Sequence, residues 1–177
     1  MVGPSRFPSC AVYSLKNFFL VGMPGSGKST TAKYISEHTD LNFIDLDVEI
    51  EKNFGKKINE IFSDKGEKFF RNKETDVLKK IVKKNNNFIL ATGGGTPCFN
   101  DNMDLIKKNG ISIFIDSKKE ILVERINKNK NRPLFKSSIS TDKKVSELYK
   151  ERFKYYNRSD FSVNNTEEIL SIINSYS

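Results

Sequence analysis

The sequence has few of the residues that metal-binding, disulfide-bonded or membrane-spanning proteins require. Its 177 residues include two cysteines and one histidine. Cys10 and Cys98 lie in unrelated contexts and have no metal-ligand spacing. His38 falls near the end of a predicted helix, where a surface position accounts for it. No apolar run approaches the length of a membrane span. The sequence therefore offers no Cys/His metal centre and no disulfide framework. It fits a reducing compartment, and we expect a cytoplasmic protein with no membrane partner.

Positive charge is in excess, with 30 Lys and Arg residues against 22 Asp and Glu residues, for a net charge of +8. A nucleic-acid surface, anionic small molecules, or a compositional bias spread over solvated faces would each explain it. Lysine and asparagine recur together, as in residues 83–87 and 127–131, without the interleaved aromatic residues that a base-stacking platform needs. We therefore favour the compositional bias for most lysines, and we expect no nucleic-acid partner.

Apolar strands and helical segments alternate from residue 18 onward. Residues 1–16 resemble a loose arm, without the charged start and apolar core of a cleaved signal. The expected strands are 18–21, 42–44, 88–91, 111–115 and 161–163, and the expected helices are 28–38, 47–53, 58–63, 67–83, 102–109, 118–127, 141–157 and 167–173. This alternation predicts one α/β domain over 17–177, in three α/β/α layers around a mainly parallel sheet. The polar, lysine-rich stretch 127–140 is expected to be a mobile lid.

Residues 18–30 form the most informative stretch of the chain. An apolar run leads into Gly22-x-x-x-x-Gly27-Lys28-Ser29, and a helix-like segment follows. This is a P-loop in its expected setting of strand, turn and helix N-terminus. Its glycines let backbone N–H groups wrap around a polyphosphate, while Lys28 contacts the β/γ-phosphates and the Ser29 hydroxyl can ligate Mg²⁺. We predict that the chain binds a nucleoside triphosphate; an ordinary glycine-rich turn is the weaker alternative.

A pair of aspartates follows the second predicted strand. Asp45 and Asp47 stand two residues apart where the strand ends, so both can point toward the phosphates. One carboxylate can support Mg²⁺ and the other can accept a proton from an attacking hydroxyl. The alternative is that Asp47 simply caps the next helix.

Two further motifs follow at later positions. Arg71 and Glu74 lie three residues apart on one helix face, so Glu74 can orient the Arg71 guanidinium. A guanidinium is suited to bidentate capture of a carboxylate. A surface ion pair is the alternative for these two residues. After the third strand, residues 93–95 are all glycine and leave backbone N–H groups accessible to substrate hydroxyls. A plain flexible turn is the alternative there.

The order of these motifs resembles the shikimate kinase family. The P-loop is followed by Phe-x-Asp-x-Asp-x-x-Ile-Glu, Phe-Arg-x-x-Glu, Gly-Gly-Gly, Arg-Pro-Leu and Glu-Arg-x-x-x-Tyr, and the resemblance covers residues 17 to about 171. It implies a P-loop kinase fold with a central five-stranded parallel sheet. It also implies transfer of the γ-phosphate of ATP to the 3-hydroxyl of shikimate on the route to chorismate, with Mg²⁺ as cofactor. ATP and shikimate are then the expected partners of a monomer.

The resemblance also assigns roles to individual residues. Asp47 would bind the shikimate hydroxyls and help to deprotonate the attacking one, and Arg71 and Arg152 would clamp the carboxylate. Arg158 is an alternative to Arg152, because the proline of the family's Arg-x-Pro-Leu-Tyr motif is absent after Arg152. The implied catalytic residues are Lys28, Asp47 and Arg132. The implied ATP-binding residues are Gly25, Ser26, Gly27, Lys28, Ser29, Thr30, Arg125 and Arg132. The implied shikimate-binding residues are Asp47, Arg71, Gly93, Gly94, Gly95 and Arg152, and the implied metal-binding residues are Ser29 and Asp45.

Three other functions are weaker alternatives. A kinase for another polyol acid such as gluconate should lack the combination of Arg71 with three consecutive glycines. A P-loop GTPase needs an Asn-Lys-x-Asp motif, of which only the fragment at 72–75 is present, inside a predicted helix. A binding protein that has lost catalysis would not be expected to keep Lys28, Asp45, Asp47 and Arg71 together.

Overall fold

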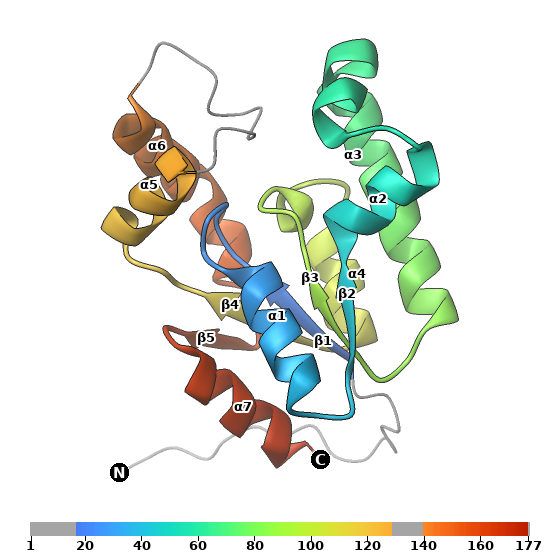
Figure 1. Cartoon of the computed structure of the whole chain (residues 1–177), viewed down its shortest axis with the longest axis vertical. Coiled ribbons are helices and arrows are strands. Elements are labelled where there is room, and N and C mark those ends of the chain that lie inside the picture. The colour runs from blue at the N-terminus through green and yellow to red at the C-terminus, as the bar shows by residue number, and fades with distance from the viewer. Residues whose placement is uncertain (1–16, 129–139, 177) are drawn as a thin grey trace.

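The computed structural model describes residues 17–128 and 140–176. The predicted arm 1–16, most of the predicted lid and Arg132 lie outside these residues. The elements follow the chain (Figure 1) in the order β1 (Asn17–Val21), α1 (Lys28–Glu37), β2 (Asn42–Asp45), α2 (Leu46–Phe54), α3 (Ile58–Lys84), β3 (Phe88–Ala91), the 3-10 helix η1 (Thr96–Cys98), α4 (Asn102–Asn109), β4 (Ile111–Ile115), α5 (Lys119–Lys128), α6 (Thr141–Tyr156), β5 (Phe161–Val163) and α7 (Thr166–Ser175).

The sheet has five strands in the order β2-β3-β1-β4-β5, and every pairing between neighbours is parallel. The predicted five-stranded parallel sheet is therefore confirmed. β1 lies in the middle, between β3 and β4. Because all five strands run the same way, their carboxyl ends meet at one edge of the sheet, and the segments that follow them are brought together there.

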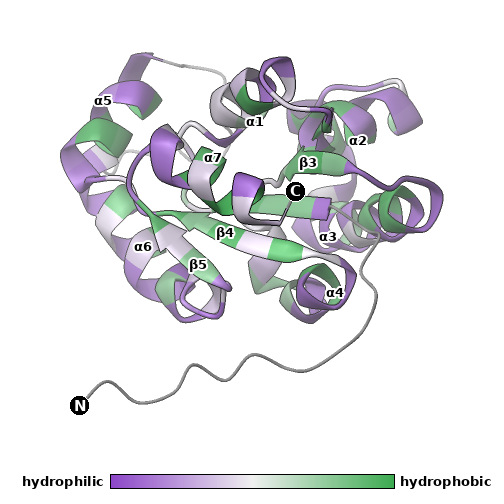
Figure 2. Ribbon diagram, turned by 90° about the horizontal axis from the view of Figure 1, so that it is seen from below, coloured by the Kyte–Doolittle hydropathy of each residue, from purple (hydrophilic) through white to green (hydrophobic). Residues whose placement is uncertain are grey.

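Alternate residues of β1 face opposite sides of the sheet and divide the core in two. Phe18 and Leu20 pack with buried residues of α1 and α7, whereas Phe19 and Val21 pack with residues of α3, α4 and α6. This period of two is the side-chain alternation of a strand that is buried on both faces. Figure 2 shows the apolar sheet between the two sets of helices. The predicted three-layer α/β/α architecture is confirmed.

The predicted helices 58–63 and 67–83 form one helix, α3, with a kink between them. Gly66 has φ 77° and ψ 170°, which is not helical, while the helix continues on both sides. A positive φ is accessible to glycine at little steric cost, which explains the kink at this position. Among the described residues, no helix is long and apolar enough to cross a membrane.

Candidate active site

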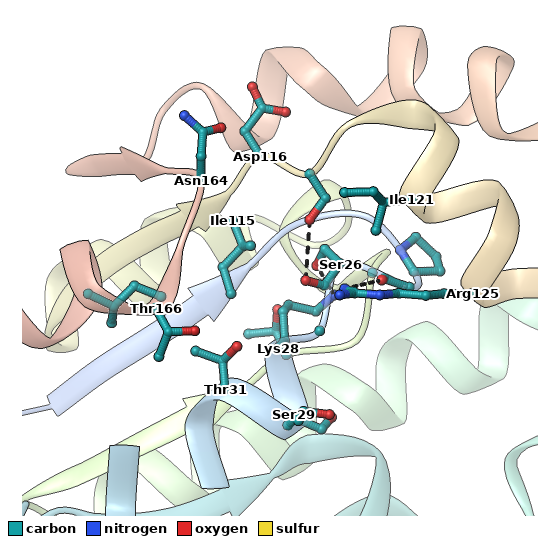
Figure 3. A pocket seen from close by; sticks show the side chains of 18 of the residues that line it. Ser26, Lys28, Ser29, Thr31, Ile115, Asp116, Ile121, Arg125, Asn164 and Thr166 are labelled. Carbon is teal, nitrogen blue, oxygen red and sulfur yellow. Dashed lines mark hydrogen bonds between the residues drawn. The ribbon is translucent and has the colours of Figure 1, made fainter. Parts of the chain in front are cut away.

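A cleft of about 850 Å³ opens along the carboxyl edge of the sheet. Its size falls within the range of pockets that hold small molecules and cofactors. The cleft is lined by the P-loop and by segments that follow the strands, namely residues 24–31, Asp47, 92–94, 115–118, Ile121, Arg125, 164–166 and Ile169. Figure 3 draws most of these side chains and labels residues of the P-loop and α1 together with residues that follow β4 and β5.

The P-loop wraps around the N-terminus of α1. Gly25 and Gly27 have φ of 88° and 93°, conformations that residues with a side chain rarely adopt. Gly27 is the N-cap of α1 and supplies no side-chain acceptor, so the first amides of the helix are not capped by it. Helix amides without such a cap form a natural binding site for anions. Ser29 and Thr30, in the first turn, are exposed and line the cleft.

The Lys28 ammonium is held inside the P-loop. Its Nζ donates to the carbonyl oxygens of Gly22 and Met23, each at 2.9 Å, and contacts Ser26 Oγ at 3.3 Å. Lys28 is only 7% exposed. The loop thus fixes one positive charge against its own backbone, beside the amides of α1 (Figure 3). This arrangement suits a polyphosphate.

Arg125 reaches from α5 over the P-loop. Its Nη1 donates to the Gly25 carbonyl oxygen at 3.3 Å, and it lies 3.2 Å from the position that a β-carbon on Gly27 would take. Residues 164–166, which follow β5, also line the cleft (Figure 3). The predicted ATP-binding residues 25–30 and Arg125 are therefore brought together in one cleft.

The two aspartates have different structural roles. Asp45 is the N-cap of α2, and its Oδ1 accepts from the backbone N–H of Asp47 at 3.0 Å and of Val48 at 3.3 Å. Asp47 lines the cleft, and its Oδ1 lies 3.1 Å from where a β-carbon on Gly93 would be. The alternative in which Asp47 caps the helix is wrong, because Asp45 makes that cap. Asp47 therefore lies against the triple glycine, in the cleft that the P-loop also lines.

Arg71 is almost fully buried and anchored by two glutamates of its own helix. Its Nη1 donates to Glu74 Oε2 at 2.9 Å, and its Nη2 and Nε contact Glu67 Oε1 at 3.1 and 3.2 Å. Glu74 has no exposed surface, and its Oε1 accepts from Thr96 Oγ1 at 2.6 Å. The guanidinium also lies 4.4 Å from the Phe99 ring centre. With 5% exposure, Arg71 does not form the surface ion pair considered as an alternative.

The triple glycine packs tightly against its surroundings. A β-carbon on Gly95 would lie 2.5–2.8 Å from the Arg71 guanidinium, and one on Gly94 would lie 2.6 Å from Pro24 Cδ. Contacts this short leave no room for a side chain. The glycines thus allow the loop to approach both the P-loop and Arg71, which a plain flexible turn would not require.

Arg152, rather than Arg158, lies near Arg71. Arg152 is 4% exposed, and its Nη1 is buried without a hydrogen-bond partner in the described parts of the chain. Burial raises the pKa of the Cys98 thiol to about 11, while the nearby charges of Arg152 and Arg71 oppose that rise. Both guanidinium groups are therefore close to the same thiol. Arg158 is exposed and pairs with Asp104 on α4 instead.

The fold brings several residues to the site that none of the sequence motifs predicts. Residues 115–118 and 164–166 line the cleft because they follow β4 and β5, so the rule that ligands bind beyond the strand ends could have indicated them. Thr96 and Phe99, which hold Glu74 and Arg71, lie just after the triple glycine. Only the three-dimensional packing identifies those two.

Comparison with known proteins gives consistent matches over most of the chain. Residues 24–175 match the family model described as shikimate kinase. The chain is 38% identical over 149 residues to a shikimate kinase of Persephonella marina, covering 84% of this chain and 88% of that one. It is 38% identical over 167 residues to a shikimate kinase of Clostridium botulinum, and this match covers 92% of this chain and 96% of that one. A shikimate kinase from Acinetobacter baumannii, solved in complex with shikimate, superposes with a TM-score of 0.86 at 31% identity. The superposition covers 93% of this chain and 96% of that one.

Proposed function

The chain belongs to the shikimate kinase family, and on this basis we propose that it transfers the γ-phosphate of ATP to the 3-hydroxyl of shikimate. The reaction yields ADP and shikimate 3-phosphate, for aromatic amino acid biosynthesis. The observation that carries the proposal is the position of Asp47, which lines the same cleft as the P-loop and lies against the triple glycine. A carboxylate there can accept the proton of a hydroxyl that attacks a phosphate held by the P-loop.

In the donor half of the site, the P-loop holds ATP. The backbone amides of residues 25–30 bind the phosphates, and the Lys28 ammonium neutralises charge on the β- and γ-phosphates. The exposed Arg125 side chain, anchored on the Gly25 carbonyl, contacts the nucleotide from α5. Phosphoryl transfer depends mainly on such positioning and charge neutralisation, because the protein forms no covalent bond to the phosphate.

In the acceptor half, two buried arginines bind the shikimate carboxylate. Arg71 is oriented by Glu67 and Glu74. Arg152 contributes a buried Nη1 that no described residue accepts from. An unpaired buried guanidinium nitrogen is costly, and a carboxylate ligand would satisfy it. The amides of residues 93–95 and the Asp47 carboxylate then bind the hydroxyl groups.

Mg²⁺ is the cofactor that this chemistry requires, and the oxygen donors of Ser29 and Asp45 fit it. Mg²⁺ usually keeps several waters and shares substrate phosphates, so it needs few protein ligands. Among the described residues, no three His, Cys, Asp or Glu side chains cluster as a metal site. When bound, the ion would neutralise charge on the transferred phosphate. Asp45 Oδ1 already caps α2, and Asp45 is not among the residues that line the cleft, so we assign it only a supporting role for the ion.

Other parts of the proposal concern the lid and the state of the protein. We propose that residues 127–140 close over the bound substrates and that Arg132, outside the described residues, contacts the phosphates. Closure would exclude water, which competes with shikimate as phosphate acceptor. The chain is proposed to act as a monomer in the cytoplasm on two small molecules, without nucleic acid or membrane. Gel filtration at assay concentration tests the monomer directly.

The direct experiment is ADP release on adding candidate acceptors to the enzyme with ATP and Mg²⁺. Shikimate should stimulate ADP release, whereas gluconate, nucleoside monophosphates and DNA should not. A Lys28→Met variant in the same assay shows whether release depends on the P-loop. If shikimate gives no stimulation, the proposed function is wrong.

A further inference from the structure

Tyr156 joins the two halves of the site and is not used by the chemistry above. It is the last residue of α6, has no exposed surface, and is the largest of the fully buried side chains in the described parts of the chain. Its hydroxyl donates to the Gly94 carbonyl oxygen and lies 3.8 Å from Met23 Sδ. Gly94 belongs to the acceptor loop and Met23 to the P-loop. One hydroxyl therefore touches both the segment that binds the donor and the segment that binds the acceptor.

The same hydroxyl lies next to Arg152, one helical turn earlier on α6. Burial raises the pKa of the Tyr156 hydroxyl, and the charge and hydrogen bond of Arg152 lower it by less. The phenol is therefore a neutral donor at working pH. The ring is fixed independently, since it stacks on Phe114 of β4 with centroids 5.1 Å apart and planes 27° apart. A ring held by the sheet thus presents its hydroxyl at a fixed point between Gly94 and Arg152.

Gly94 is also the point where the acceptor loop meets the P-loop. Its backbone lies so close to Pro24 that a β-carbon would come within 2.6 Å of Pro24 Cδ. A shift of Gly94 would therefore move the acceptor loop relative to the phosphates. Transfer rates depend steeply on the distance and alignment of the attacking hydroxyl and the phosphate. The hydrogen bond to the Gly94 carbonyl restricts such a shift.

We propose that Tyr156 is a positioning residue that fixes Arg152 and the Gly94 loop against the P-loop, and so sets where shikimate lies relative to the γ-phosphate. This inference rests on the proposed function, because it concerns the alignment of those two substrates. We propose no contact between Tyr156 and either substrate. Tyr156 acts through the Gly94 carbonyl, through Arg152 and through Met23.

Tyr156→Phe tests the proposal, because it keeps the ring on Phe114 and removes only the hydroxyl. It leaves the half-buried Gly94 carbonyl without this donor, so we expect kcat/KM for shikimate to fall about tenfold. KM for ATP should stay as in the wild type, because the amides of the P-loop and Lys28 are unchanged. The matched control is Tyr155→Phe, the same chemical change at the neighbouring residue, which is only half-buried and outside the cleft. Tyr155→Phe should keep the wild-type kcat/KM for shikimate and the wild-type KM for ATP.

Thermal unfolding of the wild type and both variants is recorded first, and kinetics are measured below the lowest of their unfolding midpoints. Calorimetric binding of shikimate and of a non-hydrolysable ATP analogue is measured on the same proteins. A selective loss on the shikimate side supports the proposal. Wild-type kinetics in folded Tyr156→Phe would overturn it, and so would an equal loss for both substrates, which indicates general loosening. If the wild type itself shows no shikimate-dependent turnover, the proposed function fails and not this inference alone.

Discussion

The Arg71→Lys substitution separates the geometry of the carboxylate clamp from its charge. Lysine keeps a cation beside Glu74, which has no exposed surface, so that buried carboxylate is not left unpaired. It loses the planar fork that Arg71 uses to contact Glu67 and Glu74 together. The substitution therefore perturbs binding more than folding.

The expected magnitude follows from the number of hydrogen bonds. A lysine can keep one of the two bonds of a bidentate pair with the substrate carboxylate, so the loss is about one charge-assisted bond, or about 1.5–3 kcal/mol. That corresponds to an increase in the shikimate KM of about 10- to 150-fold. KM for ATP should not change, because Arg71 lies against Gly95 and is not among the residues that line the P-loop cleft.

The assay is the steady-state rate of ADP formation with each substrate varied in turn. Arg158→Lys is the matched control, since Arg158 is an exposed arginine paired with Asp104 and should leave both KM values unchanged. An increase in the KM for ATP at constant shikimate KM would refute the assignment of Arg71. An increase in the shikimate KM of Arg158→Lys alone would transfer the clamp to that residue.

Three more predictions concern other parts of the molecule. Lys28→Met should abolish turnover, because it removes the charge held in the P-loop; a near-normal kcat in the coupled assay would contradict that role. Asp47→Asn should lower kcat by about 10²-fold or more while ATP binding by calorimetry is retained; an unchanged kcat would exclude Asp47 as the base. Burial raises the pKa of Asp160, but hydrogen bonds from Lys107 and Ser112 outweigh it and hold that pKa below its usual value. The resulting stabilisation is present above the unfolded-state pKa of about 3.9 and is lost as pH falls through the lower folded-state pKa. Asp160→Asn should thus destabilise the fold at neutral pH and much less in acid, measured by urea unfolding; a difference independent of pH would contradict this.

The strands and the P-loop could be predicted because their signals are local. The expected strands 88–91, 111–115 and 161–163 match β3, β4 and β5 in the structure. Buried parallel strands are short continuous apolar runs, and the P-loop motif carries its own conformation. The strand order β2-β3-β1-β4-β5 depends on contacts between distant residues, which such local signals do not contain.

The details of the site depend on packing that the sequence pattern does not contain. Asp45 and Asp47 are equally good caps by composition, and only the structure shows that Asp45 makes the cap of α2. Arg152 and Arg158 differ by less than two helical turns, yet one is buried beside Cys98 and the other pairs with a surface aspartate. Tyr156 could be noted as part of a motif, but its contact with Gly94 joins residues 62 positions apart.

The central claim is that shikimate accepts the phosphate at its 3-hydroxyl. The most direct measurement is ³¹P–¹H correlation NMR of the product formed from ATP, Mg²⁺ and shikimate. We expect one new phosphate ester coupled to the proton on carbon 3, formed in equal amount to ADP. Inorganic phosphate with no ester, or an ester at another hydroxyl, would contradict it.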